Sequence, residues 1–565
     1  MAKENYILGI SCYYHDSAAC LIEDGVIVAA AEEERFTREK HDSSFPVNAI
    51  NFCLAKAGIT AKQLSYVAFY EKPLLKFERI LSTFARTFPK SFWYFYKAVP
   101  SWMNEKLRIE KIISKKLKYE GNVLFVPHHL SHAASAFLVS PFDDAAIITC
   151  DGVGEWATTT IGLGKGNAVK LLKEIDFPDS LGLLYSTFTA YLGFEVNNDE
   201  YKVMGLAAYG KPRYHDAFRK IIDIKDDGSF KLDMRYFSYE HRQRMFSKEM
   251  IKLLGAPRKK DEKITSRHQD IAATLQKITE EIMIKTANHA YKITGSKNLC
   301  LAGGVALNCV ANGKLLSNTK FKRLFIQPAA GDSGGAIGAA FYVYNSILKN
   351  KRNYAMDDAY LGTEFSDAEI KDFLDKNKIK YELLEEDELL KKVAKLIHQD
   401  KVVGWFQGRM EFGPRALGSR SILANPCNPR MKDILNRKVK HREEFRPFAP
   451  AVLADKAQEF FEMGRSPESP FMLQTFNVRK DKQKILPSIT HVDGTARVQT
   501  VTRAQNKRFY DLIKEFGALS GVPVIINTSF NVRGQPIVNT PKDAYDCFRN
   551  TEIDCLVIGN CLVRK

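Results

Sequence analysis

Four apolar segments that end in turns rich in glycine or aspartate constrain the fold of this chain more than any other feature. They occupy residues 6–31, 145–162, 299–308 and 326–340. The first two have the pattern of strand, polar turn and strand that is typical of hairpins. The other two combine a buried strand with a glycine turn that leads into a helix. We therefore expect a mixed α/β fold built from hairpins and strand-to-helix turns.

The order of these elements resembles the architecture shared by actin, Hsp70 and the sugar kinases. In that architecture two hairpins clasp the phosphates of a nucleotide, and a later Gly-Gly turn approaches the adenosine. Glycine suits this role because it lets backbone N–H groups come close to an anion. The resemblance implies an actin-like ATPase domain in the first part of the chain.

Residues 126–156 combine two histidines with an aspartate in a pattern that favours a metal site. His128 and His132 are four residues apart, so their imidazoles would share one face of a helix. Asp151 follows a buried strand and precedes a glycine turn, where phosphate and divalent cations are commonly held. Each part alone is more often structural, since most Asp-Gly pairs are simple turns. The combination is what indicates a metal.

The length, the cysteine spacing and the net charge limit the classes to which the protein can belong. At roughly 100–200 residues per domain, the chain should hold about two to four domains. No apolar stretch approaches the ~18 residues of a membrane span, and the N-terminus lacks a signal-peptide core, so we expect a cytoplasmic protein. The 10 cysteines form no C-x-x-C pair, which is typical of reduced core thiols. The net charge of +17 is compatible with nucleic acid, a membrane surface or small anions.

The C-terminal part places many cations in glycine-rich loops after a polar, aperiodic stretch at residues 349–361. Arg forks suit phosphate and carboxylate oxygens. Because these loops lie between apolar strands, we expect a small polyphosphate pocket and consider nucleic acid an unlikely partner, since a nucleic-acid face would more often be an extended Lys-rich stripe. The cations are Arg409, Arg415, Arg420, Lys438, Lys440, His441, Arg442 and Arg446.

Residues 70–119 are aromatic and basic and are predicted to form helices. Three interpretations stay open for this region. It could be a lid or a dimer surface packed by Phe92, Trp93 and Tyr96, which would be compatible with a homodimer. It could be a wall that binds an acceptor molecule, or, less favourably, a helix that lies on a membrane surface.

The motifs HHLSHAASAF, DGVGEW, KVMGLAAYG, GGVALN, GDSGGAIGAA, GRMEFGPRALGSRSILA, KHREEFRPFAP and NTSFNVRGQPI resemble one family. It is that of the nodulation-protein-U and cephem carbamoyltransferases, which includes the tobramycin (nebramycin) carbamoyltransferase. The resemblance covers nearly the whole chain. It implies an actin-like ATPase domain of the duplicated ribonuclease-H-like type, followed by a twisted open α/β sheet similar to threonylcarbamoyl-AMP synthase. We place the two domains at residues 1–350 and 385–565, with a linker and connecting elements at residues 351–384.

The resemblance also implies a chemistry. The C-terminal domain would make carbamoyl-adenylate from carbamoyl phosphate and Mg-ATP. The N-terminal domain would transfer the carbamoyl group to a hydroxyl of a small-molecule or glycan acceptor, in natural-product biosynthesis. The acceptor itself is set by residues outside the shared motifs, for which residues 70–119 are the expected location.

Site residues follow from the same resemblance, motif by motif. Fe(II) or another divalent ion would bind His128, His132, Asp151 and Asp332, a ligand set that suits such an ion. Nucleotide and carbamoyl phosphate would be bound by Gly303, Gly304, Asn308, Arg415, Lys440, Arg446 and Asn531, with Lys440 and Arg446 as catalytic cations.

His15, in the first hairpin turn, is placed to be the base for the acceptor hydroxyl. The ordinary pKa of histidine, near ~6.5, suits that task. The other interpretation is that His15 is a loop residue that only orders Asp16.

Two other functions have to be weighed against carbamoyl transfer to a small molecule. A tRNA-modifying threonylcarbamoyl transferase is suggested by the related N-terminal domain and the basic charge, although fusion of an activating and a transferring domain argues against it. A non-catalytic, nucleotide-regulated scaffold of the actin type would leave the predicted metal ligands without a role.

Overall fold

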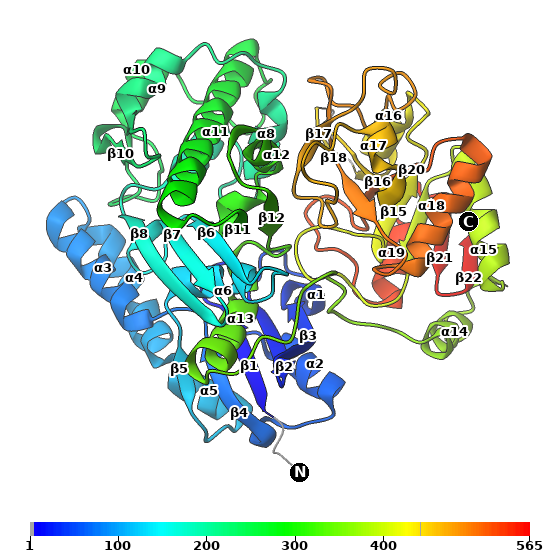
Figure 1. Ribbon diagram of the computed structural model, residues 1–565, viewed down its shortest axis with the longest axis horizontal. Coiled ribbons are helices and arrows are strands. Elements are labelled where there is room, and N and C mark those ends of the chain that lie inside the picture. Colours follow the sequence, from blue (N-terminus) through cyan, green and yellow to red (C-terminus); the bar gives the residue numbers. More distant parts are fainter. Residues whose placement is uncertain (1–4, 441, 444) are drawn as a thin grey trace. The chain divides into compact units, whose positions relative to one another are not determined.

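The computed structural model describes residues 5–440, 442–443 and 445–565 (Figure 1). It divides the chain into two compact units. Unit 1 comprises Met1–Glu33 and Ser43–Met356, and unit 2 comprises Glu34–Asp42 and Asp357–Lys565. His441, one of the predicted cations, lies outside the described residues, as does the side chain of Lys438.

Unit 1 contains two five-stranded sheets with the same connectivity, ordered β3-β2-β1-β4-β5 and β12-β11-β6-β7-β8. In each sheet the first three strands in sequence form an antiparallel meander, and two later strands add in parallel beside the first. This repeat confirms the predicted mixed α/β fold with a duplicated actin-like core. The first sheet consists of β1 (Tyr6–Ser11), β2 (Ala18–Glu23), β3 (Val26–Glu32), β4 (Leu64–Phe69) and β5 (Val123–Phe125). The second consists of β6 (Asp144–Cys150), β7 (Ala157–Lys165), β8 (Ala168–Asp176), β11 (Asn298–Ala302) and β12 (Arg323–Ile326).

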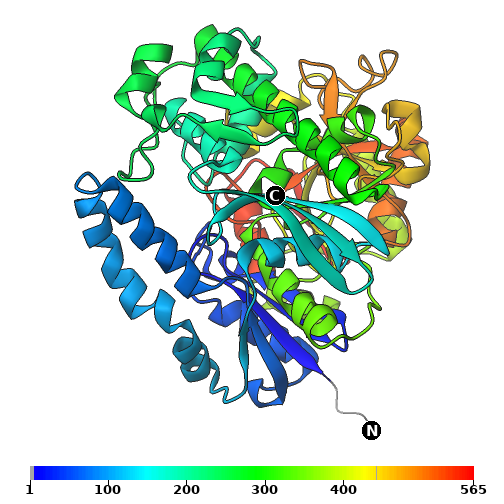
Figure 2. The ribbon, with the colours of Figure 1, turned by 60° about the vertical axis from the view of Figure 1, so that its left-hand side comes forward.

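Two buried helices pack between these sheets, α6 (His128–Phe137) on the second sheet and α13 (Asp332–Phe341) on the first (Figure 2). They approach so closely that a side chain at Gly338 of α13 would overlap the backbone carbonyl of Ser131 in α6. A side chain at Gly9 of β1 would likewise overlap the carbonyl of Ala336. The small residues of α13 are therefore required by contact with backbone, and this contact fixes how the two halves of unit 1 meet.

The remaining helices of unit 1 surround this core. The predicted helices at residues 70–119 are present, and the first two pack through Phe84 and Phe95, whose rings stack with centroids 4.2 Å apart. Among the described residues, no helix combines the length and apolar character needed to cross a membrane. These helices include α2 (Val47–Ala57), α3 (Pro73–Thr87), α4 (Phe92–Asn104), α5 (Ile109–Leu117), α7 (Leu181–Tyr191), α8 (Glu200–Ala207), α9 (His215–Ile221), α10 (Lys248–Leu254), α11 (Ser266–Thr294) and α12 (Cys309–Asn318). A small hairpin is formed by β9 (Ile222–Ile224) and β10 (Phe230–Leu232).

Unit 2 is built on an eight-stranded mixed sheet, ordered β13-β22-β21-β14-β15-β20-β16-β19. One apolar core lies between the sheet and α15 and α18, and another between the sheet and α14 and α19. Adjacent residues of one strand face opposite cores, Trp405 the first and Phe406 the second, as the alternation of a strand requires. The strands are β13 (Glu382–Leu383), β14 (Val403–Phe406), β15 (Arg420–Ala424), β16 (Ala449–Leu453), β19 (Gln499–Val501), β20 (Val524–Ser529), β21 (Cys555–Ile558) and β22 (Cys561–Arg564). The helices include α14 (Asp367–Lys376), α15 (Glu386–His398), α16 (Met431–Ile434), α17 (Ala457–Phe460), α18 (Lys507–Ser520) and α19 (Pro541–Arg549), and β17 (Thr475–Asn477) pairs with β18 (Thr495–Arg497).

The segment Glu34–Asp42 belongs to unit 2 although it comes early in the sequence. Its first residues form the short helix α1 (Glu34–Thr37). Arg35 donates to the carbonyl of Gly413 at 2.9 Å, and Arg38 donates to the carbonyls of Pro536 and Ile537 at 2.9 and 2.6 Å. Two guanidinium groups thus bind this segment to loops that lie more than 370 residues away in sequence.

We predict that Gly338→Ala lowers the free energy of unfolding of the protein by about 3 kcal/mol, because the added methyl group must displace the backbone of α6. Chemical denaturation measures this change. Gly331→Ala is the matched control, since a Cβ there meets no atom within 4 Å and the loss should stay below about 1 kcal/mol. Equal effects of the two substitutions would show that the helix contact is not tight.

Candidate active site

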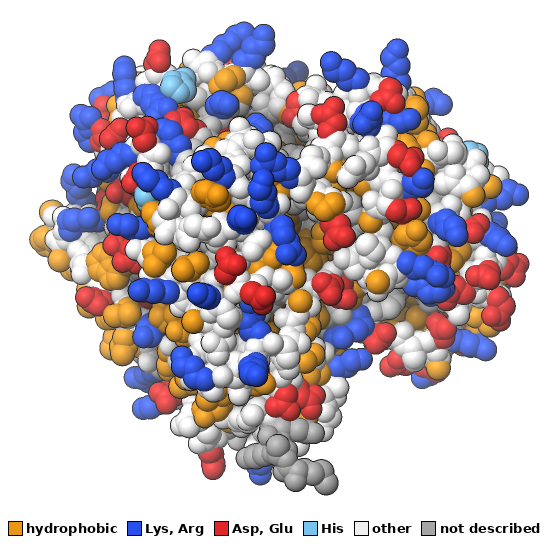
Figure 3. Space-filling model, in the orientation of Figure 1, with side chains coloured by type: hydrophobic (Ala, Val, Ile, Leu, Met, Phe, Trp, Pro, Cys, Tyr) orange, Lys and Arg blue, Asp and Glu red, His pale blue; other side chains and the backbone are white. Residues whose placement is uncertain are grey.

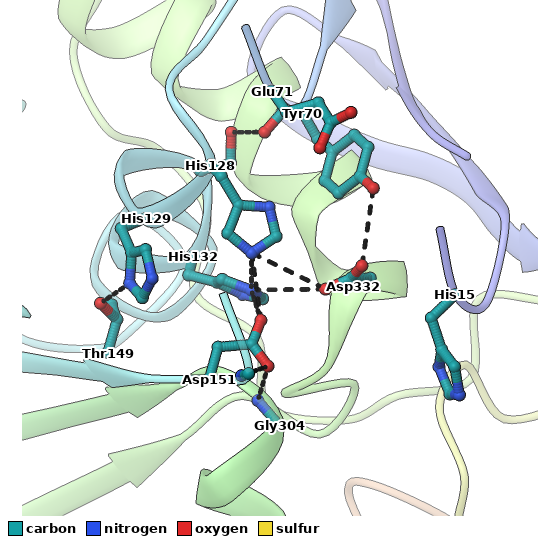
Figure 4. Close-up of polar contacts among 12 residues, drawn as sticks. His15, Tyr70, Glu71, His128, His129, His132, Thr149, Asp151, Gly304 and Asp332 are labelled. Carbon is teal, nitrogen blue, oxygen red and sulfur yellow. Dashed lines mark hydrogen bonds and ion pairs between the residues drawn. The ribbon is translucent and has the colours of Figure 1, made fainter. Parts of the chain in front are cut away.

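Four predicted ligands converge at the junction of the two halves of unit 1 (Figure 4). Both Nε2 atoms, of His128 and His132, lie 3.0 Å from Oδ2 of Asp151. They lie 3.1 Å from each other and 3.8 and 3.7 Å from Oδ1 of Asp332. The histidines come from one face of α6, Asp151 from the end of β6, and Asp332 from the first turn of α13.

These separations fit a cation held by all four groups. Bonds of about 2.1 Å place neighbouring ligand atoms about 3.0 Å apart at a right angle and about 3.4 Å apart at the tetrahedral angle. The observed distances of 3.0–3.8 Å lie at or slightly above this range. Nitrogen from imidazole together with carboxylate oxygen is a ligand set suited to divalent transition metals. The donor set therefore fits the metal that was predicted.

Surrounding groups orient the four side chains. The carboxylate of Glu155 accepts the backbone N–H of His128 at 2.9 Å and thereby fixes the start of α6. Oδ1 of Asp151 accepts from the backbone N–H groups of Gly152 and Gly304 at 2.7 and 3.3 Å, which leaves Oδ2 toward the histidines. The hydroxyl of Tyr70 lies 3.5 Å from Oδ2 of Asp332. Tyr70 is not among the predicted site residues, and its position directly after strand β4 is the one signal that could have identified it.

The electrostatics of the cluster follow from burial and pairing. Burial would raise the pKa of Asp151, but hydrogen bonds from His128 and His132 hold this pKa well below its usual range. Burial would lower the pKa of His132, whereas hydrogen bonds to Asp151 and Asp332 raise it to about 9. His129 points away from the cluster: its Nδ1 bonds the hydroxyl of Thr149 at 2.6 Å, and burial lowers its pKa well below the ordinary value.

The glycine turn after β11 lies beside the four predicted metal ligands. Ala302 of β11 pairs with Thr149 of β6, so Gly303 and Asp151 follow at the same edge of the sheet. Gly303 has a φ of 90°, and a side chain there would overlap the carbonyl of Cys150. Only glycine allows this approach.

The predicted nucleotide ligand Asn308 has a structural role. Its side-chain carbonyl accepts the N–H of Ala311 at 3.0 Å and so caps α12. Its amide forms two reciprocal hydrogen bonds with Gln276, at 3.1 and 3.0 Å. The amide is thus held in one orientation by partners within unit 1.

His15 is bound through both ring nitrogens. Nδ1 lies 2.7 Å from the carboxylate of Asp16, and Nε2 lies 2.7 Å from the carbonyl of Asn197. Burial alone would lower the pKa of His15, but these two acceptors outweigh burial and raise the pKa to about 9. Two acceptors require two N–H donors, so His15 is a cation in this arrangement. Its assignment as a base stays a prediction.

The cations of unit 2 differ in what surrounds them. Lys440 is buried, and its ammonium donates to the carbonyl and side-chain oxygen of Asn531, both at 2.9 Å, and to the carbonyl of Ser529. Burial lowers the pKa of Lys440 well below its ordinary value, and the positive charges of Arg442 and Arg446 act in the same direction. Lys440, Arg446 and Asn531 thus form one group of predicted site residues.

Two of the three arginines of the loop at residues 407–421 bond to backbone carbonyl groups and so stabilise the loop. Arg420 is fully buried, donates to the carbonyls of Gln407 and Thr363 at 2.7 and 3.0 Å, and lies over the ring of Phe406. Arg409 donates to the carbonyl of Leu361 at 2.8 Å.

Glu411 stabilises the same loop from the other side. One of its carboxylate oxygens accepts three backbone N–H groups, from Leu417, Ser419 and Arg420, at 2.7–3.2 Å. Glu411 is not among the predicted site residues, which in this loop are arginines. Arg415, which is half-buried, remains the predicted anion ligand of the loop.

Comparison with known proteins gives matches along both units. Residues 6–341 match the family model described as carbamoyltransferase N-terminus, and residues 394–565 match the one described as carbamoyltransferase C-terminus. The chain is 50% identical to the uncharacterized protein sll1178 of Synechocystis, over 99% of this chain and 97% of that protein. It is 39% identical to nodulation protein NolNO of Sinorhizobium fredii, over 98% and 79% of the two chains. It is 27% identical to nodulation protein U of the same species, over 96% of each chain.

We predict that His15 stays protonated at neutral pH and loses its proton near pH 9. Asp16→Asn should lower this pKa toward about 6.5, because the main acceptor of Nδ1–H is lost. The stability contributed by this bond should be complete below about pH 6.5 and should fade as the pH rises through the folded-state pKa. NMR of the imidazole nitrogens follows the titration, with His15→Gln identifying the signal. An unaltered protein in which His15 titrates at its ordinary pKa would contradict the arrangement.

Proposed function

Since this chain belongs to the carbamoyltransferase family, we propose that it is an ATP-dependent O-carbamoyltransferase. It would make carbamoyl-adenylate from carbamoyl phosphate and ATP and pass the carbamoyl group to a hydroxyl of a small-molecule or glycan acceptor. The observation that carries this proposal is the convergence of two imidazoles and two carboxylates in unit 1.

Unit 2 would perform the activation. Hydrolysis of carbamoyl phosphate gives carbamate and inorganic phosphate. A carbamate oxygen then attacks the α-phosphorus of ATP, the bond to pyrophosphate breaks, and carbamoyl-adenylate forms. Lys440 and Arg446 would neutralise phosphate charge in this step, with Arg415 and Asn531 beside them. The surroundings of Lys440 support this role. Burial and the nearby arginines disfavour its positive charge, and a bound phosphate would offset both effects.

Unit 1 would perform the transfer. The acceptor oxygen attacks the carbamoyl carbon, the bond between that carbon and the AMP oxygen breaks, and the hydroxyl proton leaves. A divalent ion on His128, His132, Asp151 and Asp332, Fe(II) in our proposal, would supply positive charge for the phosphate of the leaving AMP. Gly303 and Gly304 would let the backbone approach the nucleotide. His15 would accept the hydroxyl proton only when neutral, so we expect the transfer rate to rise with pH toward 9.

The alternative acceptor is tRNA, which the net charge of +17 favours. On the face shown in Figure 3, Lys and Arg side chains are interspersed with Asp and Glu instead of forming one continuous stripe. Mixed charge of this kind supports a small acceptor over a polynucleotide. Salt-sensitive affinity for tRNA would reverse this preference.

We predict that Lys440→Ala and Arg446→Ala each lower adenylate formation by at least about a hundredfold, because each removes a cation that would face polyphosphate. Pyrophosphate release measures this step. Preformed carbamoyl-adenylate should restore transfer, and Lys507→Ala, an exposed lysine of unit 2, is the matched control. A folded variant that the adenylate does not rescue would overturn the division of labour between the units.

The double substitution His128→Ala/His132→Ala should abolish metal binding and lower transfer from preformed adenylate by about a thousandfold or more. Pyrophosphate release by unit 2 should change little. Metal analysis and mass detection of the carbamoylated product are the measurements, with His215→Ala as a surface control. If the double variant keeps its metal and still carbamoylates, the four-residue cluster is structural.

A further inference from the structure

Helix α3 buries two charged side chains while several of its leucines are exposed. Its buried residues are Pro73, Lys76 and Arg79. Apolar residues lie on its outer face, where Leu74 is 74% exposed and Leu81 is 42% exposed. A surface helix normally buries its apolar stripe and exposes its charges. The side of α3 that faces the protein is therefore built for a polar or charged environment.

Arg79 lacks the partners that a buried guanidinium requires. Its side chain is nearly inaccessible, Nη1 has no hydrogen-bond acceptor among the described residues, and the guanidinium lies over the ring of Phe177 at 5.1 Å. Burial lowers its pKa, while Tyr14 and the carboxylates of Glu71 and Glu155 oppose the change. Arginine does not give up its proton in proteins, so the charge stays and needs a counter-ion.

The other buried arginines in the described part of the chain show the contrast. Each donates to carbonyl oxygens, at 2.9 Å from Arg35 to Gly413, 3.2 Å from Arg258 to Leu192 and 2.7 Å from Arg420 to Gln407. Arg258 is the nearest parallel, because it also lies over an aromatic ring, Phe194, at 5.0 Å. Among the described residues, Arg258 and Arg420 leave only Nε without an acceptor and bond through their terminal nitrogens, whereas the terminal Nη1 of Arg79 has no acceptor.

Two connections place Arg79 beside the metal cluster. The first runs through Lys76, which lies one turn before Arg79. The ammonium of Lys76 lies 4.7 Å from the ring centroid of Tyr14. The hydroxyl of Tyr14 in turn lies 3.9 Å from the position that a Cβ on Gly152 would take. Gly152 directly follows the predicted ligand Asp151.

The second connection runs through Phe177. Its loop ends at Ser180, whose hydroxyl donates to the carbonyl of Gly152 at 2.6 Å and lies 3.2 Å from that of Asp151. Both routes from Arg79 therefore lead to the turn that carries Asp151. Tyr14 is 40% exposed, so this neighbourhood is open to solvent on one side.

We propose that Arg79, together with Lys76, binds an oxyanion carried by the hydroxyl acceptor, so that the acceptor is a phosphorylated or carboxylated compound. This inference rests on the proposed function, because it assigns the acceptor of that same site. Lys76 is already paired with Glu71 at 2.5 Å, which leaves the guanidinium as the main ligand. A planar fork of N–H donors fits phosphate and carboxylate alike.

The phosphate of the adenylate is the other source of the same chemistry. The glycine turn proposed for the nucleotide lies at the end of β11 in the second sheet, and Gly304 binds Asp151 directly. Arg79 comes instead from the helix that follows β4 of the first sheet. No residue proposed for the nucleotide lies on this helix, so we assign the oxyanion to the acceptor, and the AMP arm of the second test separates the two sources.

The first test is stability and needs no carbamoyl chemistry. Arg79→Met should leave the Tm of the ligand-free protein unchanged or raise it, because a buried charge whose Nη1 has no acceptor among the described residues is removed. Arg258→Met, the matched control in the same unit, should lower the Tm, since its hydrogen bonds to carbonyls are lost. Inorganic phosphate should raise the Tm of the unaltered protein and of Arg258→Met more than that of Arg79→Met. If Arg79→Met lowers the Tm as Arg258→Met does, and phosphate acts equally on both, Arg79 is structural and the proposal fails.

The second test compares glucose, glucose 6-phosphate and glucuronate, as affinities by titration and as acceptors of carbamoyl from preformed carbamoyl-adenylate. The anionic compounds should be favoured over glucose, and Arg79→Met should lower that preference by about tenfold or more. A variant that binds AMP more weakly but keeps the preference would assign the oxyanion to the nucleotide and overturn the proposal. If the affinities shift as expected but none of the three compounds is carbamoylated, the result supports the anion site and contradicts carbamoyl transfer to these compounds. If the affinities do not shift, the anion site fails.

Discussion

The contact between α6 and α13 is the constraint on which the site of unit 1 depends. Gly338 leaves room for the carbonyl of Ser131, and the two helices meet almost backbone to backbone. The contact brings Asp332, from the first turn of one helix, to the histidines of the other. The two helices pack on different sheets, so the distances among the four predicted ligands depend on how the two halves of unit 1 are placed. Glycine in a helix loses more conformational entropy on folding than other residues. Here it allows the close helix contact that positions the four side chains.

Buried charges in the described part of the molecule differ in how fully they are paired. In unit 2, Arg420 is surrounded by carbonyl oxygens, and its charge stabilises a loop. Lys440 also has oxygen partners, but two arginines beside it disfavour its positive charge. In unit 1, Arg79 is buried, and its Nη1 has no acceptor among the residues that the structure describes. A buried charge is expensive unless it is paired, which is why we propose that anions bind at these two positions.

Local spacing in the sequence predicted part of this arrangement well. Residues four apart on a helix must share a face, and His128 and His132 do so because α6 is a regular helix. The repeated hairpin pattern predicted the mixed α/β fold because alternation and turns are local signals. Asp332 lies 181 positions beyond Asp151 and entered only through the family resemblance, since sheet order decides which turns meet. The capture of Glu34–Asp42 by unit 2 could not be predicted either, because long-range hydrogen bonds from Arg35 and Arg38 leave no pattern in the chain.

The central claim is that unit 1 binds a transition metal through two imidazoles from one helix and carboxylates from two other elements. X-ray absorption spectroscopy of the protein loaded with one equivalent of Fe(II) tests this claim most directly. The account predicts a first shell of nitrogen and oxygen only, with the multiple-scattering signature of two imidazoles, from His128 and His132. A shell that contains sulfur, or one without paired imidazoles, would place the metal elsewhere and contradict the account.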